Sequence, residues 1–142
     1  MADQAIIIRP YEDDDEAEVS QLWREVFPHD PPWNEPRAVI HRKMLVQREL
    51  FLVGDVEGLV IATVMAGFDG HRGWIHRVAV ASTFRHHGYG SAMMHAAEQR
   101  LRQIGCTKVN LQVRVGNDEV IAFYRKLGYD VEPRIAMGKR LE

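Results

Sequence analysis

The first residues whose types and spacing suggest chemistry lie between Arg85 and Gly90, which read RHHGYG. This segment follows a strand-like run and opens an amphipathic helix pattern. Glycines let a backbone approach a phosphate closely, and the free N–H groups at a helix N-terminus point toward it. Arg85, with His86 and His87 when protonated, would add charged contacts. The segment is neither a Walker A loop nor a dinucleotide fingerprint, because the Gly-Lys-Ser/Thr ending and one of three glycines are missing. The alternative interpretation is a plain tight turn into a helix.

A second group of residues follows 27 positions after Gly90, with Asn117, then Tyr124, then the pair Gly128-Tyr129. The intervening residues have the period of a helix. Asn117 could cap the start of that helix, and Tyr124 could be an ordinary core tyrosine whose hydroxyl finds a partner. The spacing alone leaves a structural and a functional interpretation open.

The elements that must position these residues follow from hydrophobic periodicity and turn residues. We predict strands over residues 5–9, 50–54, 59–68, 74–80, 108–113 and 135–140. We predict helices over about residues 13–27, 36–47, 89–104 and 118–127. The run over 59–68 is nearly all apolar and is therefore expected to be buried on both faces. The order indicates an α+β fold, in which an antiparallel meander precedes a β–α–β–α–β segment.

Length and composition favour one globular domain over residues 1–142, with 46% hydrophobic and 27% charged residues. The longest apolar run has ten residues, from Leu59 to Phe68, so we expect no membrane-spanning helix. No signal peptide is visible, and Cys106 is the single cysteine. These features predict a cytoplasmic protein without disulfides.

The charge is unevenly divided along the chain. Residues 1–71 carry 6 Lys/Arg against 14 Asp/Glu, whereas residues 72–142 carry 12 against 6. A basic half suits an anionic ligand and an acidic half suits a cationic partner, although two solvated faces would explain the same counts. We expect no nucleic acid partner, because no Lys/Arg cluster is interleaved with aromatic residues.

Taken together, the two motifs resemble the GNAT family, the Gcn5-related N-acetyltransferases that use acetyl-CoA. Val78 to Val80 followed by Arg85-x-x-Gly88-x-Gly90 is similar to the family's fourth strand and pyrophosphate loop. Val113 to Asn117, continued by Tyr124 to Tyr129, is similar to its fifth strand and the next helix, particularly in the ribosomal-protein alanine acetyltransferases. Other segments, such as Pro32 to Asn34, are similar to small uncharacterised bacterial members.

This resemblance implies a GNAT fold: one mixed, mostly antiparallel twisted sheet with about four helices, splayed between the fourth and fifth strands. It also implies acetyl-CoA as co-substrate. The residues implied to bind the cofactor are Val78, Ala79, Val80, Arg85, His86, His87, Gly88, Tyr89, Gly90, Ser91 and Asn117. The strand would offer backbone groups to the pantetheine and one N–H to the thioester carbonyl, and the loop would hold the pyrophosphate.

Two side chains are candidates for proton transfer. Tyr124 matches the family's general acid, which would meet the sulfur of the departing CoA thiolate. The positions where relatives carry a basic Glu are occupied by Trp74 and Gln112, and neither can take the proton. His76, two residues after Trp74 on the same strand, is the candidate base. The alternatives are a structural histidine and proton loss directly to water.

The acceptor implied by the resemblance is a primary amine, either a protein N-terminus or a small molecule. A non-catalytic acyl-CoA sensor or regulatory module is the alternative function. We predict no metal site, because the seven histidines include no His-x-x-x-His pair on a helix and no cysteine pair is present. A homodimer is expected only from the resemblance to this family.

Overall fold

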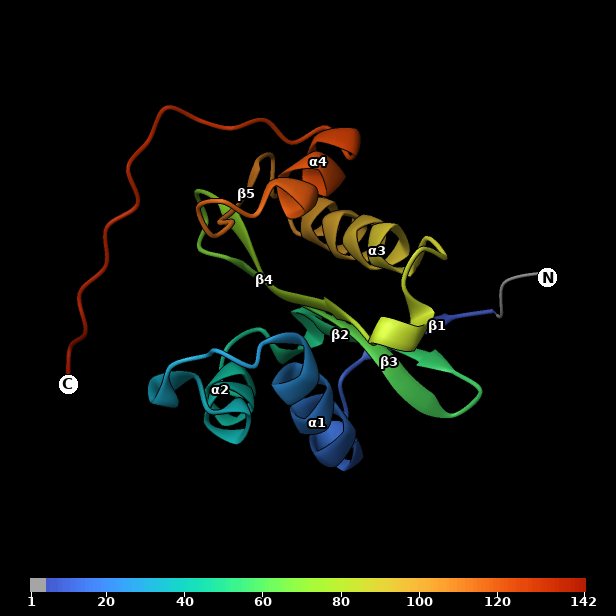
Figure 1. The fold of residues 1–142 in the computed structure, drawn as a ribbon. Helices are drawn as coiled ribbons and strands as arrows, with labels where there is room; N and C mark the ends of the chain where they lie inside the picture. The colour runs from blue at the N-terminus through green and yellow to red at the C-terminus, as the bar shows by residue number, and fades with distance from the viewer. Residues whose placement is uncertain (1–4) are drawn as a thin grey trace. The chain divides into compact units, whose positions relative to one another are not determined.

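The structure, a computed structural model, describes residues 5–142 (Figure 1). Its strands are β1 (Ile7–Pro10), β2 (Phe51–Val56), β3 (Leu59–Phe68), β4 (Gly73–Val80) and β5 (Val109–Leu111). Its α-helices are α1 (Glu16–Val26), α2 (Pro36–Lys43), α3 (Tyr89–Gln103) and α4 (Asp118–Lys126). The chain forms two compact units, a first unit over residues 1–112 and a second unit over residues 113–142. The expectation of one domain over the whole chain stays a prediction.

The first unit is built on a five-stranded sheet in the order β1-β2-β3-β4-β5. Neighbouring strands from β1 to β4 are antiparallel, whereas β4 and β5 are parallel. This mixed, mostly antiparallel sheet confirms the predicted α+β fold class. The β4–β5 ladder covers only Gly73 to Ile75 on β4, so the two strands separate beyond Ile75. The predicted splay between the fourth and fifth strands is therefore present.

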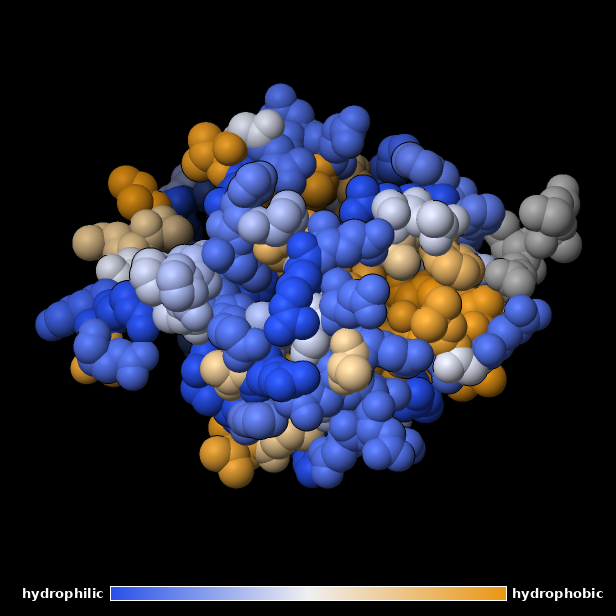
Figure 2. All heavy atoms as spheres, turned by 60° about the horizontal axis from the view of Figure 1, so that its bottom comes forward, coloured by the Kyte–Doolittle hydropathy of each residue, from blue (hydrophilic) through white to orange (hydrophobic). Residues whose placement is uncertain are grey.

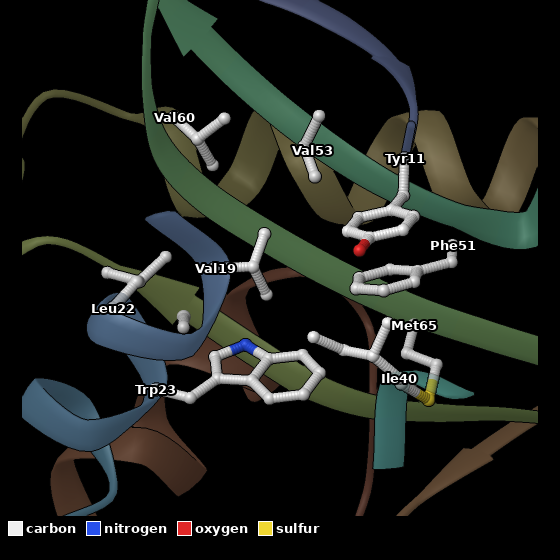
Figure 3. Packing of buried hydrophobic residues seen from close by; sticks show 10 residues of the cluster. Tyr11, Val19, Leu22, Trp23, Ile40, Phe51, Val53, Val60 and Met65 are labelled. Atoms are coloured by element: carbon white, nitrogen blue, oxygen red, sulfur yellow. The ribbon is translucent and has the colours of Figure 1, made fainter. Parts of the chain in front are cut away.

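Helices cover both faces of this sheet, with α1 and α2 on one side and α3 on the other (Figure 1). The sequence of β3 explains the arrangement, since Val60 to Ala66 are all buried, as predicted for a strand covered on both faces. On the α1 side, Tyr11 stacks on Phe51 with 4.8 Å between ring centroids, and Trp23 lies 5.8 Å from Phe51 (Figure 3). This aromatic core fixes α1 against the sheet.

The second helix is shorter than predicted and ends at Lys43 rather than near Gln47. Both residues serve β3 instead, which runs three residues beyond its last pair with β2. The Lys43 ammonium donates to the carbonyl of Ala66 at 2.5 Å, and the Gln47 amide exchanges two hydrogen bonds with the backbone of Phe68. The side chains of Lys43 and Gln47 thus form hydrogen bonds with backbone groups at the end of β3, where β2 no longer pairs with it.

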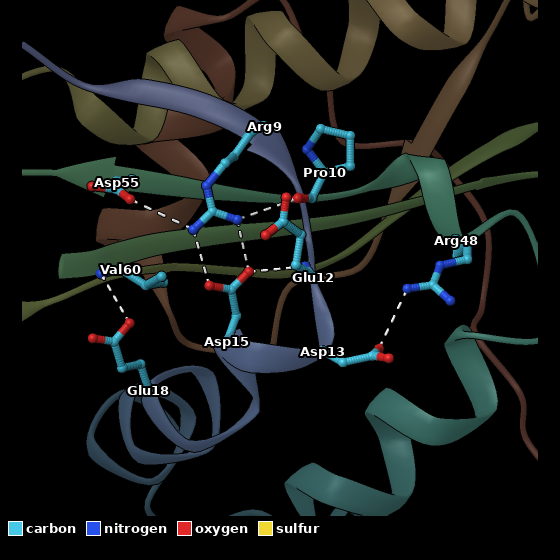
Figure 4. A network of polar contacts seen from close by, with 9 residues as sticks. All are labelled: Arg9, Pro10, Glu12, Asp13, Asp15, Glu18, Arg48, Asp55 and Val60. Carbon is cyan, nitrogen blue, oxygen red and sulfur yellow. Dashed lines mark hydrogen bonds and ion pairs between the residues drawn. The ribbon is translucent and has the colours of Figure 1, made fainter. Parts of the chain in front are cut away.

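An ion-pair network ties β1 to the start of α1 (Figure 4). The Arg9 guanidinium donates to both carboxylate oxygens of Asp15, at 2.8 and 2.9 Å, and lies 3.5 Å from Asp55. Asp15 also accepts from the backbone N–H of Glu12 at 2.8 Å, which completes a capping box. The acidic run before α1 therefore orders the chain's entry into the helix.

In the second unit, α4 ends as predicted at Leu127-Gly128. The N–H of Tyr129 donates to the carbonyl of Tyr124, and that of Gly128 to the carbonyl of Arg125, which is a Schellman motif. The predicted strand over residues 135–140 is wrong, because residues 130–142 form neither helix nor strand. Ile135 and Met137 are 91% and 93% exposed. A strand needs a paired neighbour for its backbone groups, and this segment has no ladder among the described residues.

Hydrophilic side chains cover most of the face shown in Figure 2, and apolar side chains gather there in a few separate patches. Within residues 5–142, no helix combines the length and apolar character that crossing a membrane requires.

Candidate active site

The strand β4 contains a bulge that alternation in the sequence does not reveal. Met65 pairs with His76 and Thr63 pairs with Ala79, so Arg77 and Val78 together stand opposite the single residue between Met65 and Thr63. Arg77 occupies the left-handed region with φ of 54°. An extra residue bends its strand and reverses which face the following side chains occupy. Ala79 consequently joins the α1-side core cluster.

The bulge lies where β4 loses its partner on one side. No β5 residue pairs with β4 from His76 to Val80, so backbone groups along this edge are available to something other than a strand. Val78 and Val80 are half-buried, and Ala79 is buried. These three residues, predicted to offer backbone groups to a cofactor, therefore lie in the splayed part of the sheet.

The loop from Arg85 to Gly88 carries its polar side chains into solvent. Arg85, His86, His87 and Gly88 are all exposed. His86 and Gly88 have φ of 66° and 79°, so the chain makes two left-handed steps before α3 begins. The Nε of Arg85 donates to the carbonyl of Val80 at 3.3 Å, which joins this loop to the end of β4. The structure thus brings the predicted strand and the predicted loop together.

The N-terminus of α3 directly follows Gly88, which is its N-cap and provides no side-chain cap. The first four N–H groups of any α-helix have no carbonyl partner within the helix. Gly90 and Ser91 lie in this first turn. Tyr89 is buried, with its ring 6.3 Å from Phe84 and 5.9 Å from His87 between centroids. Tyr89 therefore packs into the protein and anchors the turn, whereas most of the neighbouring side chains face solvent.

His76 lies on the face of β4 that α1 and α2 cover, since it stands opposite the core residue Met65. His76 is nevertheless exposed to solvent. Even so, partial removal from water lowers its pKa, and the positive charges of Lys43 and Arg77 lower it further. Trp74, two residues earlier, is half-buried. A histidine in this setting is neutral at pH 7 and has a free nitrogen that can accept a proton.

The second unit carries the other two predicted residues. Asn117 is the exposed N-cap of α4, but its side chain makes no capping hydrogen bond. Tyr124 packs edge-on against Phe123 and Tyr129, with ring centroids 5.0 and 5.8 Å away. Burial raises the pKa of Tyr124 to about 12. At neutral pH this phenol is a hydrogen-bond donor that holds its proton firmly.

A hollow of about 330 Å³ opens between the end of α1 and the start of α2 in the first unit. Its lining includes Trp23, Phe27, Asp30 and Glu35. Hydrogen bonding to the backbone N–H of Ala38 lowers the pKa of Glu35, so this carboxylate is ionised at neutral pH. Sequence reasoning missed this hollow, although its acidic residues lie in the half of the chain noted for negative charge.

Metal binding has no visible basis in the described part of the chain, where no three His, Cys, Asp or Glu side chains are grouped as ligands. His76 lies on β4, whereas His86 and His87 lie in the loop before α3.

The chain matches the family model described as "Acetyltransferase (GNAT) family" over residues 16–129. It is 42% identical to an acetyltransferase of Yersinia pestis (strain Pestoides F) over 134 residues, which are 94% of each chain. Both compact units fall largely within these matches, and so do all the candidate site residues.

Solved structures show the same fold. The Ard1 structure from Thermoplasma volcanium superposes with a TM-score of 0.79 at 29% identity, covering 90% of this chain and 84% of that one. The PaiA N-acetyltransferase from Thermoplasma acidophilum, solved in complex with coenzyme A, gives a TM-score of 0.81 at 18% identity. That match covers 92% of this chain and 93% of the other. A fold of this kind therefore accommodates coenzyme A in at least one neighbour.

Proposed function

The chain belongs to the GNAT family of acetyltransferases, and we propose that it transfers the acetyl group of acetyl-CoA to a primary amine. The observation that carries the proposal is the splay of β4 from β5 beside the uncapped N-terminus of α3. An open strand edge can pair with the amide groups of a pantetheine arm. A helix N-terminus preceded by exposed Arg85, His86 and His87 suits the pyrophosphate at the other end of that arm.

In this proposal the cofactor is held by backbone groups more than by side chains. Val78, Ala79 and Val80 hydrogen-bond to the pantetheine, and one N–H of this segment donates to the thioester carbonyl. The segment from Arg85 to Ser91 surrounds the pyrophosphate. Asn117, whose amide is not used to cap α4, contacts the cofactor's arm.

The reaction then balances without any metal. The amine nitrogen attacks the carbonyl carbon, and the oxygen gains negative charge that the β4 amide stabilises. The carbon–sulfur bond breaks, and the sulfur receives a hydrogen bond or proton from Tyr124. With a phenol pKa of about 12 against about 8.5 for a thiol, full proton transfer is uphill by about 5 kcal/mol. We therefore assign Tyr124 a hydrogen bond that strengthens as the thiolate forms.

The proton that the amine loses goes to His76 in the proposed mechanism. Its lowered pKa keeps the imidazole neutral, so it accepts a proton across the neutral range. The two positions with a basic Glu in relatives carry a half-buried Trp74 and an exposed Gln112 here, neither of which can do so. A water chain ending on His76 is compatible with the same assignment.

The hollow between α1 and α2 is the proposed entrance for the acceptor. Glu35 is exposed there, 3.5 Å from Arg24, and its negative charge attracts a cationic amine, whereas Asp30, Trp23 and Phe27 are already engaged by Arg77. Both a protein N-terminus and a small alkylamine have this chemistry. The acidic first half of the chain thus forms the acceptor side, and the basic second half the cofactor side.

The test is release of free CoA thiol from acetyl-CoA in the presence of peptides with different N-termini and of small amines. Thiol release that requires both the protein and one acceptor class supports the proposal. Tight acetyl-CoA binding with no thiol release from any acceptor would support the acyl-CoA sensor instead. Absence of acetyl-CoA binding by calorimetry would contradict both.

A further inference from the structure

Arg77 has a backbone conformation that arginine rarely adopts. It lies at the bulge of β4 with φ of 54°, in the left-handed region that usually contains glycine. A side chain other than glycine keeps such a conformation only when its surroundings determine it. The contacts around Arg77 should therefore explain why the bulge forms at this residue.

The guanidinium of Arg77 is held on three sides. It donates to the Asp30 carboxylate at 2.6 Å, and the two side chains are only 11% and 19% exposed. It also lies over two rings, 5.2 Å from the centroid of Trp23 and 4.7 Å from that of Phe27. A planar guanidinium suits this combination of stacking and ion pairing, which an ammonium cannot reproduce.

The backbone carbonyl of Arg77 is held as well. It accepts a hydrogen bond at 2.8 Å from the hydroxyl of Thr63, which is fully buried on β3. The same hydroxyl accepts from the indole N–H of Trp23 at 2.9 Å. Trp23 therefore supports both ends of Arg77. Its ring packs against the guanidinium, and its N–H is linked to the Arg77 carbonyl by the Thr63 hydroxyl.

We propose that Arg77 is a positioning residue which, held by Asp30, fixes the bulge in β4 and so sets the amides of Val78 to Val80 at the thioester carbonyl. This inference rests on the proposed function, which places acetyl-CoA along the same edge. The bulge decides where each backbone N–H points, and a hydrogen bond weakens steeply when its angle changes. Displacements of about 1 Å far from the reacting atoms can lower rates about 100-fold.

The link also joins the two sides of the site. Asp30 belongs to the loop between α1 and α2 and lines the hollow proposed for the acceptor, whereas Arg77 belongs to the cofactor strand. The loop that receives the amine thereby contacts the strand that polarises the thioester. Stability alone does not require this arrangement, since a buried ion pair often contributes little compared with apolar packing.

The test uses acetyl-CoA labelled with ¹³C at the acetyl carbonyl and needs no acceptor. Isotope-edited infrared difference spectra report the carbonyl stretch, which shifts to lower frequency when an N–H donates to it. We compare the wild type with Arg77→Lys and Asp30→Asn. We expect both variants to bind acetyl-CoA and to lose most of the shift. Arg48→Gln is the matched control, because it removes an Arg–Asp pair, with Asp13 at 3.4 Å, that involves no β4 residue.

A second measurement does not depend on the ligand. Amide hydrogen exchange at Ala79, which pairs with Thr63 on β3, should be at least tenfold faster in Arg77→Lys and Asp30→Asn than in the wild type or Arg48→Gln, because the bulge is no longer held. The inference is overturned if both variants keep the full carbonyl shift and wild-type exchange. A wild type that fails to bind acetyl-CoA would overturn the proposed function, and the inference with it.

Discussion

The phenol of Tyr124 keeps its proton up to a pKa of about 12, because burial opposes the phenolate. If its hydroxyl donates to the departing sulfur, Tyr124→Phe removes that contact and little else. We expect kcat to fall by about 100-fold to 10,000-fold, the range for a general acid. The affinity for acetyl-CoA should stay within about threefold, as calorimetry would show.

Tyr129→Phe is the control for this change, since it removes a hydroxyl from the neighbouring ring. Its turnover should stay near that of the wild type. Wild-type turnover in Tyr124→Phe itself would make Tyr124 a core residue, which is the structural interpretation that its sequence position left open.

The pKa of His76 offers a second test at the residue scale. Partial burial lowers it, and the nearby charges of Lys43 and Arg77 lower it further. Lys43→Met removes one positive charge, which favours the imidazolium, so the pKa of His76 should rise toward its ordinary value of about 6.5. Histidine ring signals followed by NMR against pH would measure this directly. Lys139→Met, in the exposed C-terminal segment, should leave the pKa unchanged.

The change in the pKa of His76 should also move the pH dependence of turnover in a definite direction. If His76 is the base, kcat/KM rises with pH through the pKa of His76. This rising limb of the pH–rate profile lies below about pH 6.5 in the wild type. In Lys43→Met the limb should move upward. A limb that stays in place while the NMR pKa moves would exclude His76 as the base.

Single residues divide clearly into those that sequence reasoning could find and those it could not. The glycines of the Arg85 to Gly90 loop were found because their effect is local: Gly88 adopts a positive φ and a helix follows. Arg77 was not found, because nothing in β-strand alternation marks a bulge at an arginine. Its conformation depends on Asp30 and Trp23, which are 47 and 54 residues away in sequence.

At the scale of elements, the Arg9–Asp15 pair connects β1 to α1. Burial would raise the pKa of Asp15, but hydrogen bonds from Arg9 and the Glu12 backbone outweigh it and lower the pKa. The carboxylate therefore stabilises the fold above its unfolded pKa of about 3.8. This contribution is lost as pH falls through the lower, folded-state value.

Asp15→Asn should consequently lower the free energy of unfolding by about 2–3 kcal/mol at pH 7. This is somewhat less than the typical cost of breaking a buried pair, since Arg9 is 27% exposed. Urea unfolding at pH 7 and pH 3 would measure the loss, which should shrink at the lower pH. Asp13→Asn, which removes an exposed pair with Arg48, should change the free energy by less than about 0.5 kcal/mol.

The C-terminal segment shows where local pattern misleads. Residues 135–140 contain exposed apolar side chains that suggested a strand, but pairing is a long-range property, and Pro133 and Gly138 weaken a ladder locally. Ile135→Ser combined with Met137→Ser should therefore change the free energy of unfolding by less than about 0.5 kcal/mol. Leu101→Ala, in the buried face of α3, should cost about 2–5 kcal/mol in the same urea titration.

If the double serine variant lost more than about 1 kcal/mol, the segment would have to pack against something in solution.

At the scale of the whole molecule, the element order and the sheet class could be predicted from apolar periodicity, because each helix or strand has its own local pattern. The sequence also shows the division of charge directly, with an acidic half over residues 1–71 and a basic half over residues 72–142. What could not be predicted was the grouping of Trp23, Phe27 and Asp30 into a hollow. That grouping requires the end of α1 and the following loop to pack beside β4.

Binding of acetyl-CoA should be visible in the stability of the first unit, which contains all three tryptophans, Trp23, Trp33 and Trp74. A ligand present at 100 times its Kd stabilises the fold that binds it by about 2.7 kcal/mol. Urea unfolding followed by tryptophan fluorescence, with and without acetyl-CoA, measures this shift in the first unit.

The contribution of the loop before α3 to acetyl-CoA binding can be separated from the effect of backbone strain by comparing substitutions at two glycines. Gly88 and Gly58 have φ of 79° and 85°, and an added Cβ would meet no atom within 4 Å at either position. Valine should therefore strain both backbones to a similar degree without a clash inside the protein. Only at Gly88 would the new side chain stand where a pyrophosphate must approach. We expect Gly88→Val to lose most of the stabilisation by acetyl-CoA, while Gly58→Val, in the β2–β3 turn, keeps it. Equal shifts in the two variants would mean that the pyrophosphate binds elsewhere and that this loop is only a tight turn into α3.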